Sequence, residues 1–131
     1  MGNANEGSSM TQIDAARAGT ITREMAVVAE KEGRDPEFIR EGVAAGRIAI
    51  PANIRHASLS PEGVGGGLRT KVNVNLGTSG DLACEAEEWQ KADVALALGA
   101  DALMALSNHG KTAPLRRALT ATTPALNGPP P

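Results

Sequence analysis

The sequence is poor in cysteine and in aromatic residues. Its 131 residues include one cysteine, one tryptophan, one phenylalanine and no tyrosine. The single cysteine, Cys84, excludes an internal disulfide and a cysteine-rich metal site, and it fits a reducing, cytoplasmic setting. Because only 2% of the residues are aromatic, a hydrophobic core has to be built from alanine, valine, leucine and isoleucine, which bury less area each.

The chain also lacks a marked excess of charge and any long apolar run. Its formal net charge is −2, with acidic and basic residues interspersed. We therefore expect neither a basic face for nucleic acid nor a polybasic patch for a membrane surface. No apolar run approaches the ~20 residues needed to span a bilayer. The start of the chain has no apolar segment of the kind found in signal peptides.

The first part of the chain carries the start signals of three short helices. Residues 1–9 are polar and without period, and we interpret them as a disordered leader. Thr11 is expected to cap the first helix, the second is expected to span about 22–32, and Asp35-Pro36 marks the start of the third. Glycines shortly after each apolar stripe predict where these helices end.

A short strand is predicted over 47–50, and the chain then becomes irregular. Proline and glycine oppose regular structure across much of 51–68. Within it, Gly65-Gly66-Gly67 is interpreted as a flexible connector rather than a phosphate cradle. Residues 10–68 are therefore predicted to form a small helical unit followed by a linker.

The remainder of the chain, 69–131, alternates between strand and helix signals. The expected elements are a strand over 71–76, a helix over 85–98, a strand over 102–106, a helix from Thr112 and a strand over 125–127. Glu87 and Lys91, four residues apart, are expected to pair on the helix surface. This order is typical of parallel strands joined by helices, and a barrel of that kind takes about 250 residues. We predict an α/β protein, with a small helical amino-terminal unit followed by the first strand–helix units of a truncated (β/α)8 barrel.

Polar residues gather where two of the predicted strands end, and ligands of α/β units meet this edge. Asn75 gives the sharpest signal, because an inward-facing amide needs a partner, either a ligand or neighbouring backbone. Met104 lies in the next strand, where the alternative is a core methionine. The residues selected by position are Asn73, Asn75, Gly77, Thr78, Ser79, Met104, Ser107, Asn108 and His109.

Other candidates have ordinary interpretations. Gly77-Thr78-Ser79-Gly80 could bind phosphate through backbone amides, but it lacks the lysine ending of a P-loop and reads as a tight turn. His56 and His109 are candidates by residue type, since histidine is a common acid–base group, yet lone loop histidines are more often solvated. Cys84 has no second residue for metal binding or thiol catalysis. Spacing alone predicts a partial α/β domain with a polar site and no complete catalytic set.

Three stretches form longer motifs in a fixed order. They are Met10-Thr11-Gln12 with Asp14-Ala15-Ala16-Arg17; Pro36-Glu37-Phe38-Ile39-Arg40 through Gly46-Arg47 to Ile50-Pro51-Ala52-Asn53-Ile54; and Gly67-Leu68-Arg69-Thr70-Lys71-Val72-Asn73 with Asn75, Gly77-Thr78-Ser79, Gly99-Ala100-Asp101 and Met104. Together they resemble the amino-terminal part of phosphomethylpyrimidine synthase, an enzyme of thiamine biosynthesis.

The resemblance implies a radical lyase that converts 5-aminoimidazole ribonucleotide to hydroxymethylpyrimidine phosphate. The family uses S-adenosylmethionine, a 4Fe–4S cluster and zinc, and its members are homodimers. The resemblance also implies that Asn75 and Met104 bind the ribonucleotide. The family's zinc histidines and cluster cysteines fall beyond Pro131, so we expect this chain alone to bind none of these cofactors and to be inactive alone.

Some positions depart from the family pattern. Where many members read Met-Asp-Leu-Ser followed by a glycine pair, this chain reads Met104-Ala105-Leu106-Ser107-Asn108. Val74 and Leu76 in the first strand, and Arg116-Arg117, are more similar to a paralogous group, the 5-hydroxybenzimidazole synthases of anaerobic cobamide lower-ligand synthesis. Two alternatives therefore stay open: part of such a paralogue, or a non-enzymatic remnant or partner protein.

Overall fold

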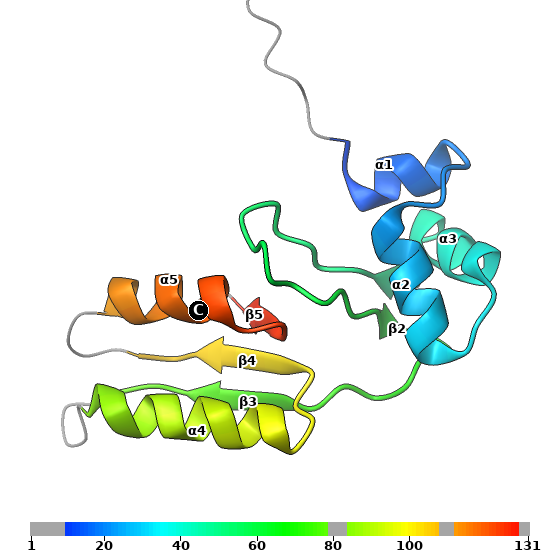
Figure 1. Ribbon diagram of the computed structural model, residues 1–131. Coiled ribbons are helices and arrows are strands. Elements are labelled where there is room, and N and C mark those ends of the chain that lie inside the picture. Colours follow the sequence, from blue (N-terminus) through cyan, green and yellow to red (C-terminus); the bar gives the residue numbers. More distant parts are fainter. Residues whose placement is uncertain (1–9, 79–83, 108–111, 129–131) are drawn as a thin grey trace, which may run out of the picture.

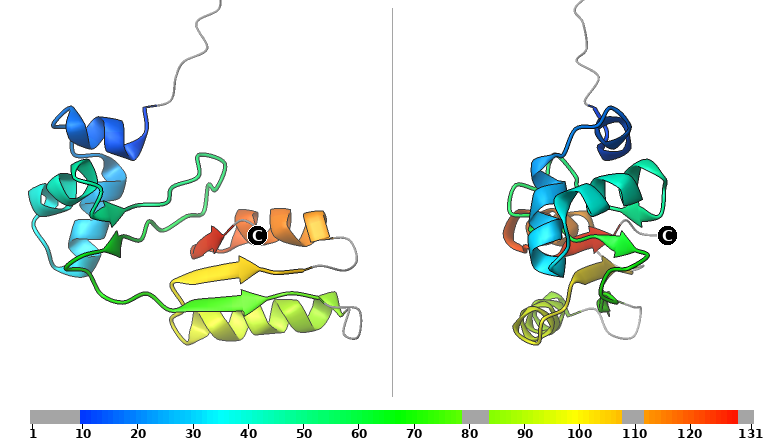
Figure 2. Two further views of the ribbon diagram at one scale, coloured as in Figure 1. Left: turned by 180° about the vertical axis from the view of Figure 1, so that it is seen from behind. Right: turned by 90° about the vertical axis from the view of Figure 1, so that its right-hand side faces the viewer.

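The computed structural model describes residues 10–78, 84–107 and 112–128, and these form two bodies joined by extended segments (Figure 1). Three helices lie at one end of the molecule, and a three-stranded sheet with two helices lies at the other (Figure 2). The expected leader, 1–9, lies outside the described residues. No helix in the described part of the chain is long and apolar enough to cross a membrane.

The first body contains α1 (Gln12–Arg17), α2 (Arg23–Glu32) and α3 (Pro36–Ala44). Their starts are as the sequence predicts. The Thr11 hydroxyl accepts a hydrogen bond from the Asp14 amide at 3.2 Å and completes a capping box. Thr22 caps α2 and Asp35 caps α3 in the same manner. Gly33, at φ +60°, ends α2 because a left-handed residue closes a helix well only when it lacks a Cβ.

Two short antiparallel strands, β1 (Ile48–Ala49) and β2 (Val64–Gly65), complete this body. The second strand corrects the interpretation of the glycines as a flexible connector. Gly65 has φ +151°, and a Cβ there would lie 2.2 Å from the Arg47 carbonyl oxygen. The Gly66 amide donates to that same oxygen at 3.1 Å. The cluster beneath them consists of Ala16, Met25, Val28, Ala29, Ile39, Val43, Ile48 and Ile50.

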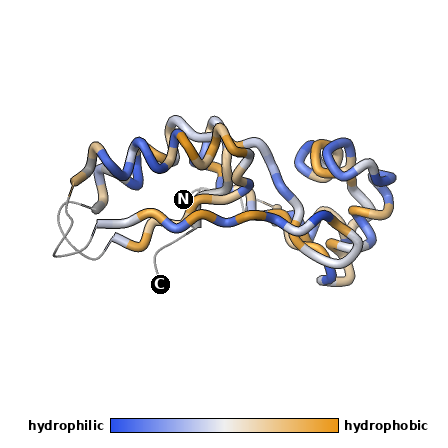
Figure 3. Tube along the Cα trace, turned by 90° about the horizontal axis from the view of Figure 1, so that it is seen from below, coloured by the Kyte–Doolittle hydropathy of each residue, from blue (hydrophilic) through white to orange (hydrophobic). Residues whose placement is uncertain are grey.

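The second body is a parallel sheet of β3 (Asn73–Leu76), β4 (Ala102–Ala105) and β5 (Leu126–Gly128), in that order. The crossovers are α4 (Glu85–Ala97) and α5 (Thr112–Thr122), so the predicted strand–helix alternation is confirmed. Both helices pack on one face of the sheet (Figure 2). Figure 3 shows hydrophobic and hydrophilic residues alternating along the helices, as expected for elements with one buried face. The shared cluster consists of Leu76, Ala92, Ala95, Leu103, Leu119 and Ala125.

Ion pairs connect the end of α2 to the start of the sheet. Lys71 Nζ lies 2.6 Å from Glu32 Oε1, and the two side chains are only 7% and 4% exposed. Glu32 also accepts from the Arg69 amide at 2.7 Å. Burial raises the pKa of the Glu32 carboxyl, but the hydrogen bonds from Arg69 and Lys71 and their charges outweigh it and leave the pKa below its usual value.

A second connection corrects the expectation that His56 is solvated. His56 is buried, and its Nε2 lies 2.7 Å from the Thr123 carbonyl oxygen beyond α5. The Ser58 hydroxyl donates to the same oxygen at 2.9 Å, and the Ser60 amide donates to the Pro124 carbonyl at 2.9 Å. The irregular segment therefore packs against the end of the sheet body.

Candidate functional site

One face of the parallel sheet is polar, and no helix of the described chain covers it. Val74 and Leu76 face α4 and the hydrophobic cluster. Asn73 and Asn75 lie on the opposite face, as the alternation of the sequence predicts. The Asn73 side-chain nitrogen donates to the Asn75 side-chain oxygen at 3.0 Å. This bond uses the Asn75 side-chain oxygen and leaves its NH2 group without a hydrogen bond to another described residue.

Met104 lies next to Asn75 across the sheet. The parallel register of β3 and β4 pairs Asn75 with Met104 and Val74 with Leu103. Because paired residues share a face, the half-buried Met104 side chain belongs to the same face as the Asn75 amide, whereas Leu103 is in the core. The two candidate binding residues are therefore neighbours near the carboxyl ends of their strands.

The carboxyl ends of β3 and β4 are tied together by backbone contacts. The Leu106 amide donates to the Leu76 carbonyl at 2.6 Å, and the Thr78 amide donates to the Ser107 hydroxyl at 3.2 Å. Gly77 packs closely against the residue that follows β4, because a Cβ on Gly77 would be 2.8 Å from the Leu106 carbonyl carbon. The remaining candidates, Ser79, Asn108 and His109, lie outside the described residues.

Sequence reasoning missed Glu88, a buried carboxylate beneath this edge. Glu88 Oε2 accepts from the Gly77 amide at 2.6 Å, and Oε1 accepts from Lys91 Nζ at 2.6 Å. The expected pairing of Lys91 with Glu87 is therefore wrong. The hydrogen bond that Lys91 donates to Glu88 raises the pKa of Lys91. Desolvation opposes this shift, and the negative charges of Glu88 and Glu87 add to it. The available signal was helical spacing, since Glu88 falls on the face of the buried Ala92 and Ala95.

Asp101 is a second buried carboxylate, at the opposite, amino-terminal edge of the sheet. Its oxygens accept from the Arg69 guanidinium at 2.5 and 3.0 Å and from the Val72 amide at 2.8 Å. The Arg69 hydrogen bonds, working against desolvation, hold the pKa of the Asp101 carboxyl below its usual value. Because it sits away from the carboxyl ends of the strands, Asp101 holds the start of β3 and does not itself line the candidate site.

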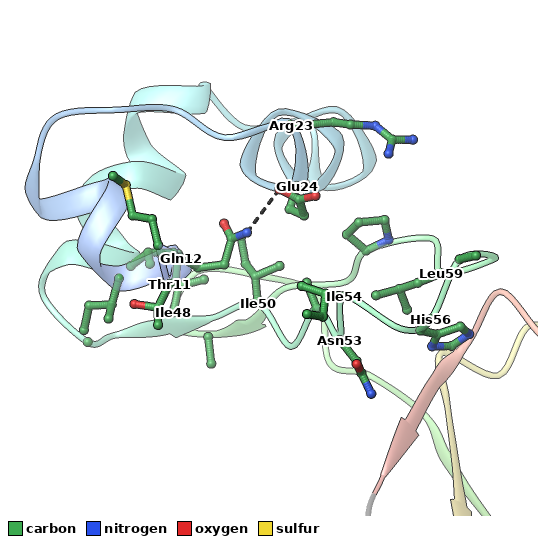
Figure 4. A pocket seen from close by; sticks show the side chains of 18 residues that line it. Thr11, Gln12, Arg23, Glu24, Ile48, Ile50, Asn53, Ile54, His56 and Leu59 are labelled. Carbon is green, nitrogen blue, oxygen red and sulfur yellow. Dashed lines mark hydrogen bonds between the residues drawn. The ribbon is translucent and has the colours of Figure 1, made fainter. Parts of the chain in front are cut away.

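A separate cavity of about 750 Å³ lies in the helical body, between α1, α2 and the segment after β1 (Figure 4). Its wall includes apolar Ile50 and Leu59. The polar groups at its rim bond to one another: Gln12 Nε2 donates to Glu24 Oε2 at 3.1 Å, and the Thr22 hydroxyl donates to Gln12 Oε1 at 2.6 Å. Arg23 and Asn53 also line the cavity, so its wall is mixed, partly apolar and partly polar.

The parallel strands and their helical crossovers define an α/β domain. In this class of fold, ligands are usually bound at the carboxyl ends of the strands, where the polar groups lie here. The chain belongs to the radical SAM ThiC family, whose model matches residues 11–131. It is 53% identical over 118 residues to a phosphomethylpyrimidine synthase of Alkaliphilus metalliredigens, covering 90% of this chain. It is 55% identical over 118 residues to that of Thermus thermophilus, covering 88% of this chain. It spans 27% of the length of these curated relatives.

The family implies S-adenosylmethionine and an iron–sulfur cluster, and the residues of this chain do not fit the cluster. Such clusters are held by several cysteine thiolates. This chain has Cys84 alone, which is exposed next to the start of α4. Among the residues that the structure describes, no three histidine, cysteine, aspartate or glutamate side chains form a metal-binding group. The side chains of Asn75 and Met104 offer a hydrogen-bonding amide and an apolar thioether side by side on the sheet face.

Proposed function

We propose that this chain supplies part of the substrate site of a phosphomethylpyrimidine synthase. Such an enzyme makes hydroxymethylpyrimidine phosphate from 5-aminoimidazole ribonucleotide in thiamine biosynthesis. The observation that carries the proposal is the pair Asn75 and Met104, adjacent on an uncovered sheet face in a chain more than half identical to such synthases. The whole activity, with its homodimer, belongs to a protein of the relatives' full length.

The uncovered face supports a (β/α)8 barrel as the complete architecture. Parallel sheets occur with both faces covered, yet α4 and α5 lie on the same face here. In a barrel the second face turns inward and is filled by side chains from all strands. Asn73, Asn75 and Met104 would then point to the barrel interior. We accordingly propose that residues 69–131 are the first part of the barrel and that residues 10–68 precede it as a separate unit.

The chemistry of this face suits a polar substrate. Asn75 accepts from Asn73 through its oxygen, so its NH2 group is left to donate to an oxygen or ring nitrogen of the ribonucleotide. The Met104 thioether adds an adaptable apolar contact beside it. When bound, the cluster and S-adenosylmethionine supply the radical chemistry. Asn75 and Met104 hold the substrate in register and take no part in bond breaking.

The test is Asn75→Ala in a full-length synthase that contains this segment. A buried hydrogen bond lost from one partner costs about 1–3 kcal/mol, so we expect KM for 5-aminoimidazole ribonucleotide to rise by roughly 5- to 150-fold. Thermal stability should change little, because Asn75 is exposed in this chain. Gln90→Ala, which removes an exposed amide from α4, is the matched control.

The opposite result would identify Asn75 as a structural residue: lower stability with an unchanged KM for the folded fraction. Product analysis in the same assay separates hydroxymethylpyrimidine phosphate from 5-hydroxybenzimidazole, the product of the paralogous group. If the folded wild-type protein with intact cofactors makes neither product, a non-enzymatic role is favoured.

A further inference from the structure

We propose that Glu88 is a positioning residue for the substrate site, holding the carboxyl end of β3, and with it Asn75, through the Gly77 amide. The inference rests on the proposed function, because it concerns the same site. It adds a residue that touches no substrate and that lies on the helix side of the sheet.

The burial of Glu88 requires an explanation, since a charged side chain in an alanine-lined helix face is costly without partners. Its side chain is only 4% exposed. Each carboxylate oxygen has one partner at 2.6 Å, the Gly77 amide on one side and Lys91 on the other. Lys91 is half exposed and lies on the same helix, so its bond fixes nothing outside α4. The bond to Gly77 is the one that connects two elements.

Gly77 is well placed to transmit this restraint. It follows β3 directly, two positions after Asn75, and its backbone packs on Leu106 and Ser107 at the end of β4. A shift of Gly77 therefore disturbs both strand ends, and it disturbs the Thr78–Ser107 hydrogen bond. Small displacements of binding groups are enough to lower substrate affinity and turnover substantially.

A merely structural role for Glu88 makes a different prediction. In that case its loss would lower stability, and the folded fraction would bind substrate normally. A positioning role predicts a higher KM in protein that is still folded. It also predicts rescue by glutamine, because the amide oxygen of Glu88→Gln can still accept from Gly77.

The experiment compares Glu88→Ala, Glu88→Gln and Glu87→Ala in a full-length synthase that contains this segment. Glu87 is the matched control, because it is the adjacent carboxylate of α4 and is exposed. We expect Glu88→Ala to raise KM for 5-aminoimidazole ribonucleotide about tenfold while kcat falls by less than about threefold. Glu88→Gln should recover most of the loss, and Glu87→Ala should leave KM unchanged. Amide exchange of Gly77 should accelerate in Glu88→Ala only.

An unchanged KM in folded Glu88→Ala, or equal effects in Glu88→Gln and Glu88→Ala, would overturn the inference. If Glu88→Ala yields no folded enzyme, Glu88→Asp replaces it under the same criteria, since its shorter side chain withdraws the acceptor from Gly77. Asn75→Ala separates the two proposals. No KM effect from Asn75→Ala refutes the proposed site, whereas an effect from Asn75 without one from Glu88 refutes only the positioning role.

Discussion

Asp101 connects the start of β4 to the segment before β3 at the amino-terminal edge of the sheet, and removing its carboxylate should destabilise the sheet body. Its oxygens accept from the Val72 amide before β3 and from the Arg69 guanidinium. The Asp101 side chain is only 6% exposed. Asp101→Ala therefore leaves the Val72 amide without its acceptor and also removes the partner of Arg69.

The size of the loss follows from the exposure of each partner. A backbone amide that loses a charged acceptor near the interior costs about 1.5–3 kcal/mol. The Arg69 pair adds little, because the Arg69 side chain is 55% exposed and solvent screens the pair. We expect Asp101→Ala to lower the free energy of unfolding by about 2–3 kcal/mol. Asp101→Asn, which keeps one neutral acceptor, should lose about half of that.

Urea denaturation followed by Trp89 fluorescence measures this loss, because Trp89 is the one tryptophan and packs against the sheet cluster. Asp93→Ala is the control, since Asp93 is an exposed aspartate on α4. The reasoning fails if Asp101→Ala costs no more than Asp93→Ala. A change in the denaturant slope without a shift of the midpoint would also contradict it.

The same prediction has a pH dependence of definite sign. The pKa of Asp101 is lowered in the folded protein, so its contribution is fully present above the unfolded value, 3.8. It is lost as the pH falls below 3.8 and through the lowered folded pKa. The difference in stability between wild type and Asp101→Asn should therefore stay constant from neutral pH down to about 4 and shrink below it.

Two further predictions concern the first body and its connection to the sheet. Gly65→Ala should separate β2 from β1 and lower the free energy of unfolding by more than about 1 kcal/mol, because the new Cβ would meet the Arg47 carbonyl. Gly66→Ala is the control and should be near neutral in the same urea titration, because a Cβ there meets nothing within 4 Å. Lys71→Met should cost about 3 kcal/mol, at the low end for a broken buried ion pair, because Glu32 loses its charged partner but keeps the hydrogen bond from the Arg69 amide. The double change with Glu32→Gln should recover part of that loss, and additive single effects in this double-mutant cycle would contradict direct coupling.

Features set by local chemistry were predictable from the sequence. The predicted caps at Thr11 and Asp35 depend on residues within one helical turn, and both are present. The alternation around Val74 and Asn75 likewise settles which face of β3 meets the helices. In each case the pattern and its structural consequence lie within a few residues.

Features set by distant partners were not predictable in this way. β2 forms because the backbone of Gly65 and Gly66 lies against the Arg47 carbonyl. Considered alone, the two glycines indicate only conformational freedom. His56 is buried because Thr123, 67 positions away, offers it a carbonyl. Surface pairing rules assigned Lys91 to the wrong glutamate, because they take no account of the buried Gly77 amide that places Glu88 inward.

The two buried carboxylates of the sheet body act at opposite ends of the same strand pair. Asp101 fixes the approach to β3 at the amino-terminal edge, and Glu88 fixes its exit at the carboxyl-terminal edge. Asn75 and Met104 lie between these two restraints, on the face that neither carboxylate occupies. A binding group held at both ends of its strand loses little further freedom when a ligand arrives, so its hydrogen bond contributes more fully to affinity. The contacts of Asp101 and Glu88 would therefore keep the proposed site at Asn75 and Met104 in shape in the absence of substrate.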